Sequence, residues 1–250
     1  MDKNTLSNYG WIVIAVLVLS VMIALATPFG EYIKAGVENT TEGLFKVEQQ
    51  ALNVVHNPLK EKNIAVFGTS ISAGIKTSSI PYCRIIAENN EMTLQNYAVG
   101  GHKIMDTLDV YRTQKSNLNS LGKDDYVIFE GLLNNVNQTL GTITPENTKS
   151  FDETTVLGAL ESLLYEYRNS GCKAKVGFIL THFSTSTQTD ATLLAKYNKY
   201  WDDAIMVLEK YDIPYLDLRS ETFSMLDKVH PDNEGYAKMA VPVEYWLKTI

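Results

Sequence analysis

The sequence predicts an α/β fold of the flavodoxin-like type, a three-layer sandwich in which helices cover both faces of a five-stranded parallel sheet. From Asn63 onward, short apolar runs alternate with stretches of helical periodicity. Such alternation is typical of βαβ units, whose crossovers place parallel strands in one sheet with both faces covered. The 250 residues, 45% of them hydrophobic, are enough for one such domain and an additional segment.

The individual elements follow from five apolar runs and the segments between them. Each run is short and is bounded by polar or turn-forming residues, as expected of a buried strand. We expect strands in Ile64–Gly68, Thr93–Val99, Tyr126–Gly131, Ala174–His182 and Tyr215–Leu218. The intervening segments carry apolar residues at helical spacing. They predict helices near 81–89, 104–116, 155–170, 191–211 and 233–248.

Composition excludes some classes of partner. A net charge of −7 and a pI near 5.2 provide no basic surface of the kind that binds phosphate backbones, so we expect no nucleic-acid partner. Cys83 and Cys172 are too few for a disulfide scaffold and lack the spacing of metal ligands. We interpret both as small buried hydrophobic residues, with a single disulfide in an oxidising compartment as the alternative.

The amino-terminal residues 1–30 predict a transmembrane helix or signal-anchor. No charged residue occurs from Leu6 to Phe29, and Trp11–Ala26 is apolar except for Ser20. At about 1.5 Å per residue, the window from Tyr9 to Phe29 is long enough to cross a hydrocarbon core of about 30 Å. We therefore expect a single-pass anchor in the cell membrane, followed by a juxtamembrane helix and linker in 31–62 and the main domain in 63–250.

A cleavable signal peptide is the second interpretation of this segment. Ala24-Leu25-Ala26 has the small-x-small form of a cleavage site, and Lys3 provides a weakly basic start. The anchor is favoured because Lys3 is the only basic side chain before the apolar run. A short leading segment before a large domain is typical of signal-anchors, so we expect the main domain to be extracytoplasmic. Cleavage would make the protein secreted.

Residues suited to nucleophilic catalysis follow the predicted strands. Ser70 comes just after the first strand, and Asp227 and His230 lie between the last strand and the last helix. A serine hydroxyl becomes a nucleophile when a neighbouring base takes its proton, and a carboxylate that accepts the other imidazole N–H orients that base. Because the carboxyl ends of parallel strands meet at one edge of a sheet, we expect these three side chains to meet there.

An oxyanion hole is expected from the backbone N–H groups of Ser70 and Gly101 and from the side-chain amide of Asn134. Such donors stabilise the negative charge of a tetrahedral intermediate, and losing one costs on the order of 3 kcal/mol. Taken singly, each residue has a simpler explanation: Ser70 as a helix cap, Asn134 as a turn residue, and His230 as a loop histidine beside an acid. Their combination indicates catalysis, with no metal or organic cofactor required.

The other histidines have no carboxylate partner at short range in the sequence. These are His56, His102 and His182. We expect them to be surface or loop residues. His102 and His182 follow predicted strands and are expected to border a pocket.

From Asn63 to Leu247 the motifs resemble those of the SGNH hydrolases, also called GDSL-type esterases or lipases. Gly68-Thr69-Ser70 is similar to the block that carries the nucleophile, with Thr69 in place of aspartate. Asn96 to Gly101, NYAVGG, is similar to the block that contributes a glycine amide. The final Asp-x-x-His block is intact at Asp227 and His230.

The third block departs from the pattern of the family it resembles, which is usually Gly-x-Asn-Asp. Leu132-Leu133-Asn134-Asn135 keeps the asparagine and loses the glycine and the aspartate, although Gly131 lies one place earlier. This chain thus keeps the serine, glycine, asparagine and histidine that the resemblance assigns to catalysis. It departs from the family pattern in the residues around them.

The resemblance implies the SGNH hydrolase fold and a serine ester hydrolase that works through an acyl-enzyme. For an extracytoplasmic member, we expect O-acyl groups, including O-acetyl, on carbohydrates as substrates, and lipid esters second. Transfer of the acyl group to a sugar hydroxyl by the same site is one alternative. The other is a catalytically degenerate module for glycan binding or surface display, for which Thr69, Leu132 and Asn135 are the evidence.

Overall fold

The computed structural model describes residues 57–74 and 79–250. All of them except Asn57 belong to the unit Pro58–Ile250, in which Leu59 of the expected linker is already fully buried. The predicted transmembrane helix and most of the juxtamembrane segment lie outside the described residues. Within the described part, no helix combines the length and the apolar character needed to cross a bilayer.

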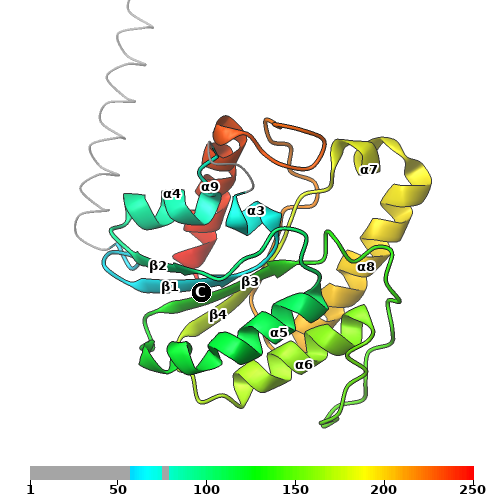
Figure 1. Cartoon of the computed structure of the whole chain (residues 1–250), viewed down its shortest axis with the longest axis horizontal. Coiled ribbons are helices and arrows are strands. Elements are labelled where there is room, and N and C mark those ends of the chain that lie inside the picture. Colours follow the sequence, from blue (N-terminus) through cyan, green and yellow to red (C-terminus); the bar gives the residue numbers. More distant parts are fainter. Residues whose placement is uncertain (1–56, 75–78) are drawn as a thin grey trace, which may run out of the picture. The chain divides into compact units, whose positions relative to one another are not determined.

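The strands form one parallel five-stranded sheet in the order β2-β1-β3-β4-β5 (Figure 1). Their bounds are β1 Asn63–Phe67, β2 Thr93–Asn96, β3 Tyr126–Gly131, β4 Lys175–Leu180 and β5 Tyr215–Asp217. This is the strand order of flavodoxin-like sheets, in which ligands bind at the carboxyl ends of the strands. The predicted fold class of the main domain is therefore confirmed.

The second strand is shorter than predicted, although the chain beyond it still follows β1. The backbone N–H of Tyr97 bonds the carbonyl of Val66 at 2.8 Å, and that of Val99 bonds the carbonyl of Gly68 at 3.0 Å. These bonds hold the loop after β2 beside the loop after β1. Two of the segments with candidate site residues are thus joined by backbone hydrogen bonds.

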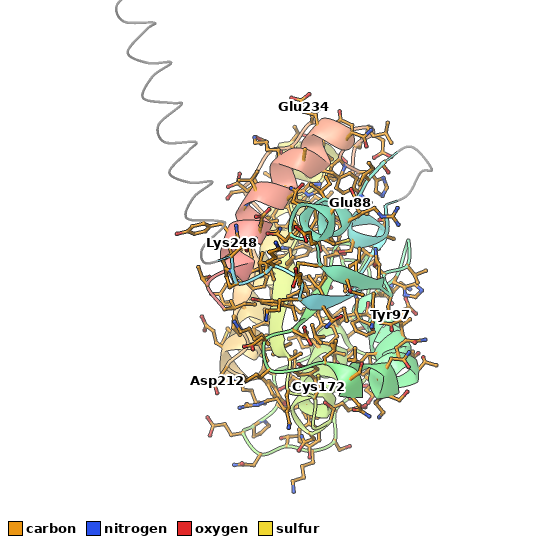
Figure 2. All side chains as sticks on the ribbon, turned by 90° about the vertical axis from the view of Figure 1, so that its left-hand side faces the viewer. Glu88, Tyr97, Cys172, Asp212, Glu234 and Lys248 are labelled. Carbon is orange, nitrogen blue, oxygen red and sulfur yellow. The ribbon has the colours of Figure 1, made fainter. Side chains whose placement is uncertain are left out.

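Helices cover both faces of the sheet. In chain order they are α3 Ser70–Ala73, α4 Tyr82–Asn89, α5 Ile104–Gln114, the 3₁₀ helix η1 Lys115–Ser120, α6 Val156–Arg168, α7 Thr185–Thr189, α8 Ala191–Lys210 and α9 Asn233–Leu247. Helices α3, α4 and α9 cover one face, and α5, α6 and α8 cover the other (Figure 1). Charged residues such as Glu88 of α4 and Glu234 of α9 lie on the outer surface of the first layer (Figure 2).

The five longer helices begin within one residue of the predicted starts, and side-chain caps account for three of these starts. Thr155 accepts a hydrogen bond from the N–H of Gly158, Asp190 from Thr192 and Leu193, and Asp232 from Gly235. Each cap satisfies N–H groups that have no partner inside their helix, typically stabilising it by about 1 kcal/mol. The short helices α3 and α7 were not predicted as elements, because four or five residues are too few to show a helical period.

A row of phenylalanines fills the core on the α5–α6 side of the sheet. Phe67, Phe129 and Phe178 are register partners on β1, β3 and β4. Tyr111 of α5 and Tyr167 of α6 pack edge-on against Phe129, with ring centroids 5.7 and 5.9 Å apart. Burial of each such side chain stabilises the fold by about 1.5–3 kcal/mol. The row therefore anchors the strands whose ends carry the site.

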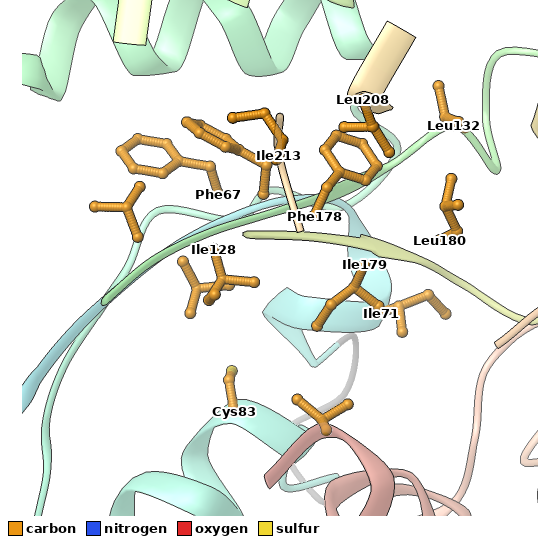
Figure 3. Packing of buried hydrophobic residues seen from close by; sticks show 14 of the residues in the cluster. Phe67, Ile71, Cys83, Ile128, Leu132, Phe178, Ile179, Leu180, Leu208 and Ile213 are labelled. Carbon is orange, nitrogen blue, oxygen red and sulfur yellow. The ribbon is translucent and has the colours of Figure 1, made fainter. Parts of the chain in front are cut away.

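The opposite face of the sheet packs against α3, α4 and α9. Figure 3 shows Ile128, Ile179 and Cys83 on this side, away from Phe67 and Phe178. Cys83 is buried as predicted, and this burial raises the pKa of its thiol to about 12. Cys172 is only partly buried, because it lies in the loop after α6. Both thiols are free, so the disulfide alternative is not formed here.

Candidate active site

Ser70 is the first residue of α3 and follows directly on the end of β1 and the Gly68-Thr69 pair. We call Gly68–Ser72 the nucleophile turn. Thr69 is extended and caps α3, its hydroxyl accepting a hydrogen bond from the N–H of Ile71 at 3.3 Å. Ser70 Oγ lies 3.0 Å from His230 Nε2. The predicted nucleophile and base, 160 positions apart in the chain, are therefore within hydrogen-bond distance.

Asp227 binds the other side of the imidazole. His230 Nδ1–H donates to the carboxylate, 2.8 Å from Oδ2 and 3.0 Å from Oδ1. The carboxylate also accepts the backbone N–H groups of Val229 and His230, both at 2.8 Å. The bond from the His230 side chain, with the two backbone bonds, holds the pKa of Asp227 well below its usual value. An ionised Asp227 keeps the proton on Nδ1, so Nε2 is free to accept the Ser70 proton.

The segment Met225–Pro231, which we call the histidine loop, is closed by backbone bonds and held from outside. Leu226 N donates to the carbonyl of His230 at 2.8 Å, and Met225 and Pro231 form an antiparallel bridge. From the start of α7, Thr185 N donates to the carbonyl of Lys228 at 3.0 Å. The loop therefore presents His230 from a fixed backbone.

His182 is a further support that the sequence did not reveal. Its Nε2 lies 3.0 Å from the carbonyl of Val229, which can only accept, so Nε2 carries the proton. The side chain is 1% exposed, and burial lowers its pKa, which favours the neutral imidazole. It also lines a cavity of about 70 Å³, which confirms that it borders a pocket. The sequence signal was its position after β4, although nothing local indicated Val229 as its partner.

The predicted oxyanion donors follow three different strands, as expected. A Cβ placed on Gly100 would lie 3.8 Å from Ser70 Cβ, so the Gly100–Gly101 turn adjoins the nucleophile. Gly101 has φ +81°, a left-handed conformation that favours glycine. Asn134 Nδ2 donates to the carbonyl of His102 at 2.9 Å, which joins the third block to the second. Convergence of the three donors on one oxyanion position stays a prediction.

The two departures in the third block have separate structural consequences. Leu132 is fully buried and has φ +82°, the conformation for which glycine is suited and which costs other residues about 1–3 kcal/mol. Asn135 is also fully buried, and its Oδ1 accepts the N–H of Ile104 at the start of α5, at 3.1 Å. That contact requires an acceptor oxygen rather than a charge. Asparagine can therefore replace aspartate there.

Glu130, at the end of β3, is a buried carboxylate beside the nucleophile turn that sequence analysis missed. Its Oε2 accepts the backbone N–H of Thr69 at 2.7 Å and the hydroxyl of Ser72 at 2.9 Å. Burial raises the pKa of Glu130, and the hydrogen bonds from Thr69 and Ser72 oppose this shift. The available signal was an acidic residue inside an otherwise apolar run, YVIFEG.

The described residues contain no cluster of His, Cys, Asp and Glu side chains able to hold a metal ion.

Similar proteins share this fold over most of their length. A protein from Lactobacillus plantarum superposes with a TM-score of 0.60 at 21% identity, covering 76% of this chain and 98% of that one. A lipase/acylhydrolase from Enterococcus faecalis superposes with a TM-score of 0.52 at 18% identity, covering 75% of this chain and 96% of that one. A catalytic mutant of an acetylxylan esterase from Geobacillus stearothermophilus superposes with a TM-score of 0.52 at 16% identity, covering 75% of this chain and 94% of that one.

The sequence comparisons identify the family. No curated protein matches the chain significantly. Residues 64–243 match the sequence model described as GDSL-like Lipase/Acylhydrolase, and this range is well over half of the chain. Ser70, Gly101, Asn134, Asp227 and His230 all lie within the matched range. The chain therefore belongs to the GDSL-like lipase/acylhydrolase family and is an esterase or acylhydrolase of the SGNH type.

Proposed function

We propose that this protein is a membrane-anchored serine esterase that removes O-acyl groups, in particular O-acetyl, from carbohydrates outside the cytoplasm. Lipid esters are the second class of substrate. The observation that supports catalysis most directly is the 3.0 Å distance between Ser70 Oγ and His230 Nε2, with Asp227 on the opposite ring nitrogen. The same three groups in this order form the catalytic unit of serine hydrolases.

Each group has a defined role in the proposed reaction. His230 Nε2 takes the proton of Ser70 as Oγ attacks the ester carbonyl, and Asp227 stabilises the imidazolium. The N–H groups of Ser70 and Gly101 and the amide of Asn134 bind the oxyanion. The imidazolium then protonates the leaving alcohol, which leaves an acyl-enzyme on Ser70. Water, deprotonated by His230, releases the acid and regenerates the serine.

Two features favour a short acyl group on a carbohydrate. The segment after β4, Thr181–Asp190, is rich in Ser and Thr and offers hydroxyl groups to a polar substrate. Val99 and Leu226 are exposed apolar residues directly before Gly100 and Asp227, and each offers a small apolar contact for an acyl chain. A solved structure of similar fold is an acetylxylan esterase, although it is only 16% identical.

The membrane location rests on the uncharged apolar segment between Leu6 and Phe29. An anchored esterase would act on polymers near the membrane surface.

The proposed function is tested by measuring acetate release from acetylated xylo-oligosaccharides and turnover of p-nitrophenyl acetate by the full-length protein. We expect both activities in the wild type and neither in Ser70→Ala. Analysis of the products with an added carbohydrate acceptor separates hydrolysis from acyl transfer. Equal turnover by the wild type and Ser70→Ala would reject the mechanism, and turnover of p-nitrophenyl acetate without acetate release from the sugar would reject the substrate class.

A further inference from the structure

Glu130 is a charged residue at a position where the strand pattern calls for an apolar one. All of β3 is buried, and Ile128, two residues earlier, faces the same packed layer (Figure 3). Glu130 itself is 0% exposed. Within residues 57–74 and 79–250, it forms no ion pair with a lysine, arginine or histidine. A buried carboxylate is costly unless hydrogen bonds compensate it, so its partners indicate its role.

The partners of Glu130 lie on both sides of Ser70. Before the nucleophile, Thr69 donates twice: its N–H bonds Oε2 at 2.7 Å, and its hydroxyl lies 2.9 Å from Oε1 and 3.0 Å from Oε2. After the nucleophile, the hydroxyl of Ser72 donates to Oε2 at 2.9 Å. One side chain from β3 thus fixes the residue directly before Ser70 and the residue two places after it. The Ser70 N–H is not among these donors and stays available for the oxyanion.

The hydrogen bonds have one direction that satisfies every group. Ser72 has one hydroxyl proton, and when Glu130 accepts it, Ser72 Oγ accepts in turn from Tyr82, whose hydroxyl is 2.7 Å away. The carbonyl of Ser72 also accepts from Asn96 Nδ2 at 2.8 Å and from the Cys83 thiol at 3.3 Å. The turn is therefore held by β3, by α4 and by the end of β2, with the Glu130 carboxylate as the final acceptor.

Gly68 makes room for this carboxylate. A Cβ on residue 68 would lie 2.5 Å from Glu130 Oε2 and 3.1 Å from Glu130 Cβ. Only glycine lets the glutamate lie against the backbone at the start of the nucleophile turn. The glycine and the glutamate are thus sterically matched, although Gly68 follows β1 and Glu130 lies on β3.

We propose that Glu130 is the positioning residue of the nucleophile. It holds Thr69 and Ser72 so that Ser70 Oγ stays within reach of His230, and it supplies from β3 a carboxylate that the turn lacks at position 69. This inference rests on the proposed role of Ser70. A misplacement of about 1 Å in a reacting group can reduce the rate by about 100-fold. Because Glu130 is fully buried and does not touch substrate, its loss acts on kcat rather than on KM.

The first test is Glu130→Gln in the full-length protein. Glutamine keeps the shape but presents an NH₂ group to donors that need an acceptor. We expect kcat for p-nitrophenyl acetate to fall about 10- to 100-fold, with KM within about twofold of wild type. The matched control is Glu161→Gln, since Glu161 is also fully buried and bonds Thr144 and Lys210 outside the site. The control loses thermal stability, but its folded fraction keeps the wild-type kcat.

The second test is rescue by moving the carboxylate. Thr69→Asp alone places two carboxylates in contact and lowers kcat. In Thr69→Asp/Glu130→Gln the amide of residue 130 can donate to the carboxylate of residue 69, and we expect kcat at least about fivefold above that of Glu130→Gln. If Glu130→Gln does not fold, a comparison of Thr69→Val with Thr69→Ser replaces this test. Loss of the hydroxyl in the valine variant should lower kcat about tenfold more than in the serine variant.

The outcomes separate this inference from the proposed function. If the wild type turns over ester and Ser70→Ala does not, yet folded Glu130→Gln keeps the wild-type kcat, the positioning role is wrong and the esterase stands. The positioning role is also wrong if the double variant is no better than Glu130→Gln. If the wild type and Ser70→Ala behave alike, the proposed function itself fails.

Discussion

Ser70 and His230, 160 positions apart in the chain, form a 3.0 Å hydrogen bond at the carboxyl edge of the sheet. Ser70 begins α3 directly after β1, and His230 lies in the loop between β5 and α9. In a parallel sheet every strand ends at the same edge, which allows residues from both ends of a long chain to meet there. The strand order β2-β1-β3-β4-β5 also brings Glu130, at the end of the neighbouring strand β3, beside the nucleophile turn.

Asp227→Asn should reduce kcat at least about 100-fold, because an amide can donate to Nδ1 and then favours the tautomer with its proton on Nε2, facing Ser70. The measurement is turnover of p-nitrophenyl acetate near pH 8. Asp212→Asn, at a strongly exposed aspartate just after α8, is the control and keeps the wild-type rate. A wild-type rate in Asp227→Asn would show that the carboxylate does not orient the histidine.

The same aspartate predicts a pH dependence of stability. Its pKa is lowered in the folded protein, mainly by the hydrogen bond from His230. The ionised group therefore stabilises the fold above the pKa of an unfolded aspartate, about 3.9, and this contribution is lost as pH falls toward the folded pKa. The melting-temperature advantage of wild type over Asp227→Asn should be full near pH 6 and shrink below about pH 4. A difference independent of pH between 6 and 3 would contradict this.

At Leu132 we predict that the usual order of stability of alanine and glycine variants is reversed. Both substitutions remove the buried side chain, but only glycine relieves the conformation at φ +82°. Leu132→Gly should therefore be about 1 kcal/mol more stable than Leu132→Ala. At the neighbouring Leu133, which is buried without a positive φ, glycine should be the less stable by about 0.5–1 kcal/mol. Chemical denaturation of the four variants measures this, and the same order at both sites would refute it.

His182 predicts a separate effect on the histidine loop. His182→Leu leaves the carbonyl of Val229 without its donor at 3.0 Å, so we expect a loss of about 1–3 kcal/mol of stability and a lower kcat in the folded enzyme. His182→Gln retains an N–H donor and should recover part of both. Denaturation curves and turnover of p-nitrophenyl acetate test this together. Equal kcat in the leucine variant and the wild type would limit His182 to a role in stability.

The amino-terminal segment predicts where the protein is found. If residues 1–30 are an anchor, the intact protein stays in the membrane fraction through alkaline carbonate washing and is released by detergent, because about 20 apolar residues span the bilayer. Removal of 1–30 should release it. A mature protein whose amino terminus follows Ala26, found outside the cells, would instead establish a cleaved signal peptide.

Much of the fold was predictable, because the relevant signals are local. The run Tyr126–Gly131 coincides with β3, and the predicted start at residue 191 coincides with that of α8. The site residues Ser70, Asp227 and His230 were found because each follows a strand and because Asp227 and His230 are three residues apart. Periodicity and short spacing are properties of one segment at a time, which is why they are visible in a single sequence.

The missed features depend on contacts between segments. Glu130 is part of an apolar run, and only folding shows that its carboxylate meets Thr69 and Ser72. His182 likewise bonds Val229, a residue 47 positions away. Leucine normally avoids a positive φ, but Leu132 adopts one, because burial of its side chain offsets the backbone strain. Such tertiary hydrogen bonds and strain leave no periodic trace in the sequence.

The central claim is that Ser70 is an activated nucleophile, and covalent labelling of the full-length protein tests it most directly. A fluorophosphonate reacts with a serine whose proton is taken by a neighbouring base. Mass spectrometry of the labelled protein should place the adduct on Ser70 in the wild type, with no adduct in Ser70→Ala and much slower labelling in His230→Ala. A folded wild-type protein that is not labelled, or that is labelled at another residue, would contradict the assignment.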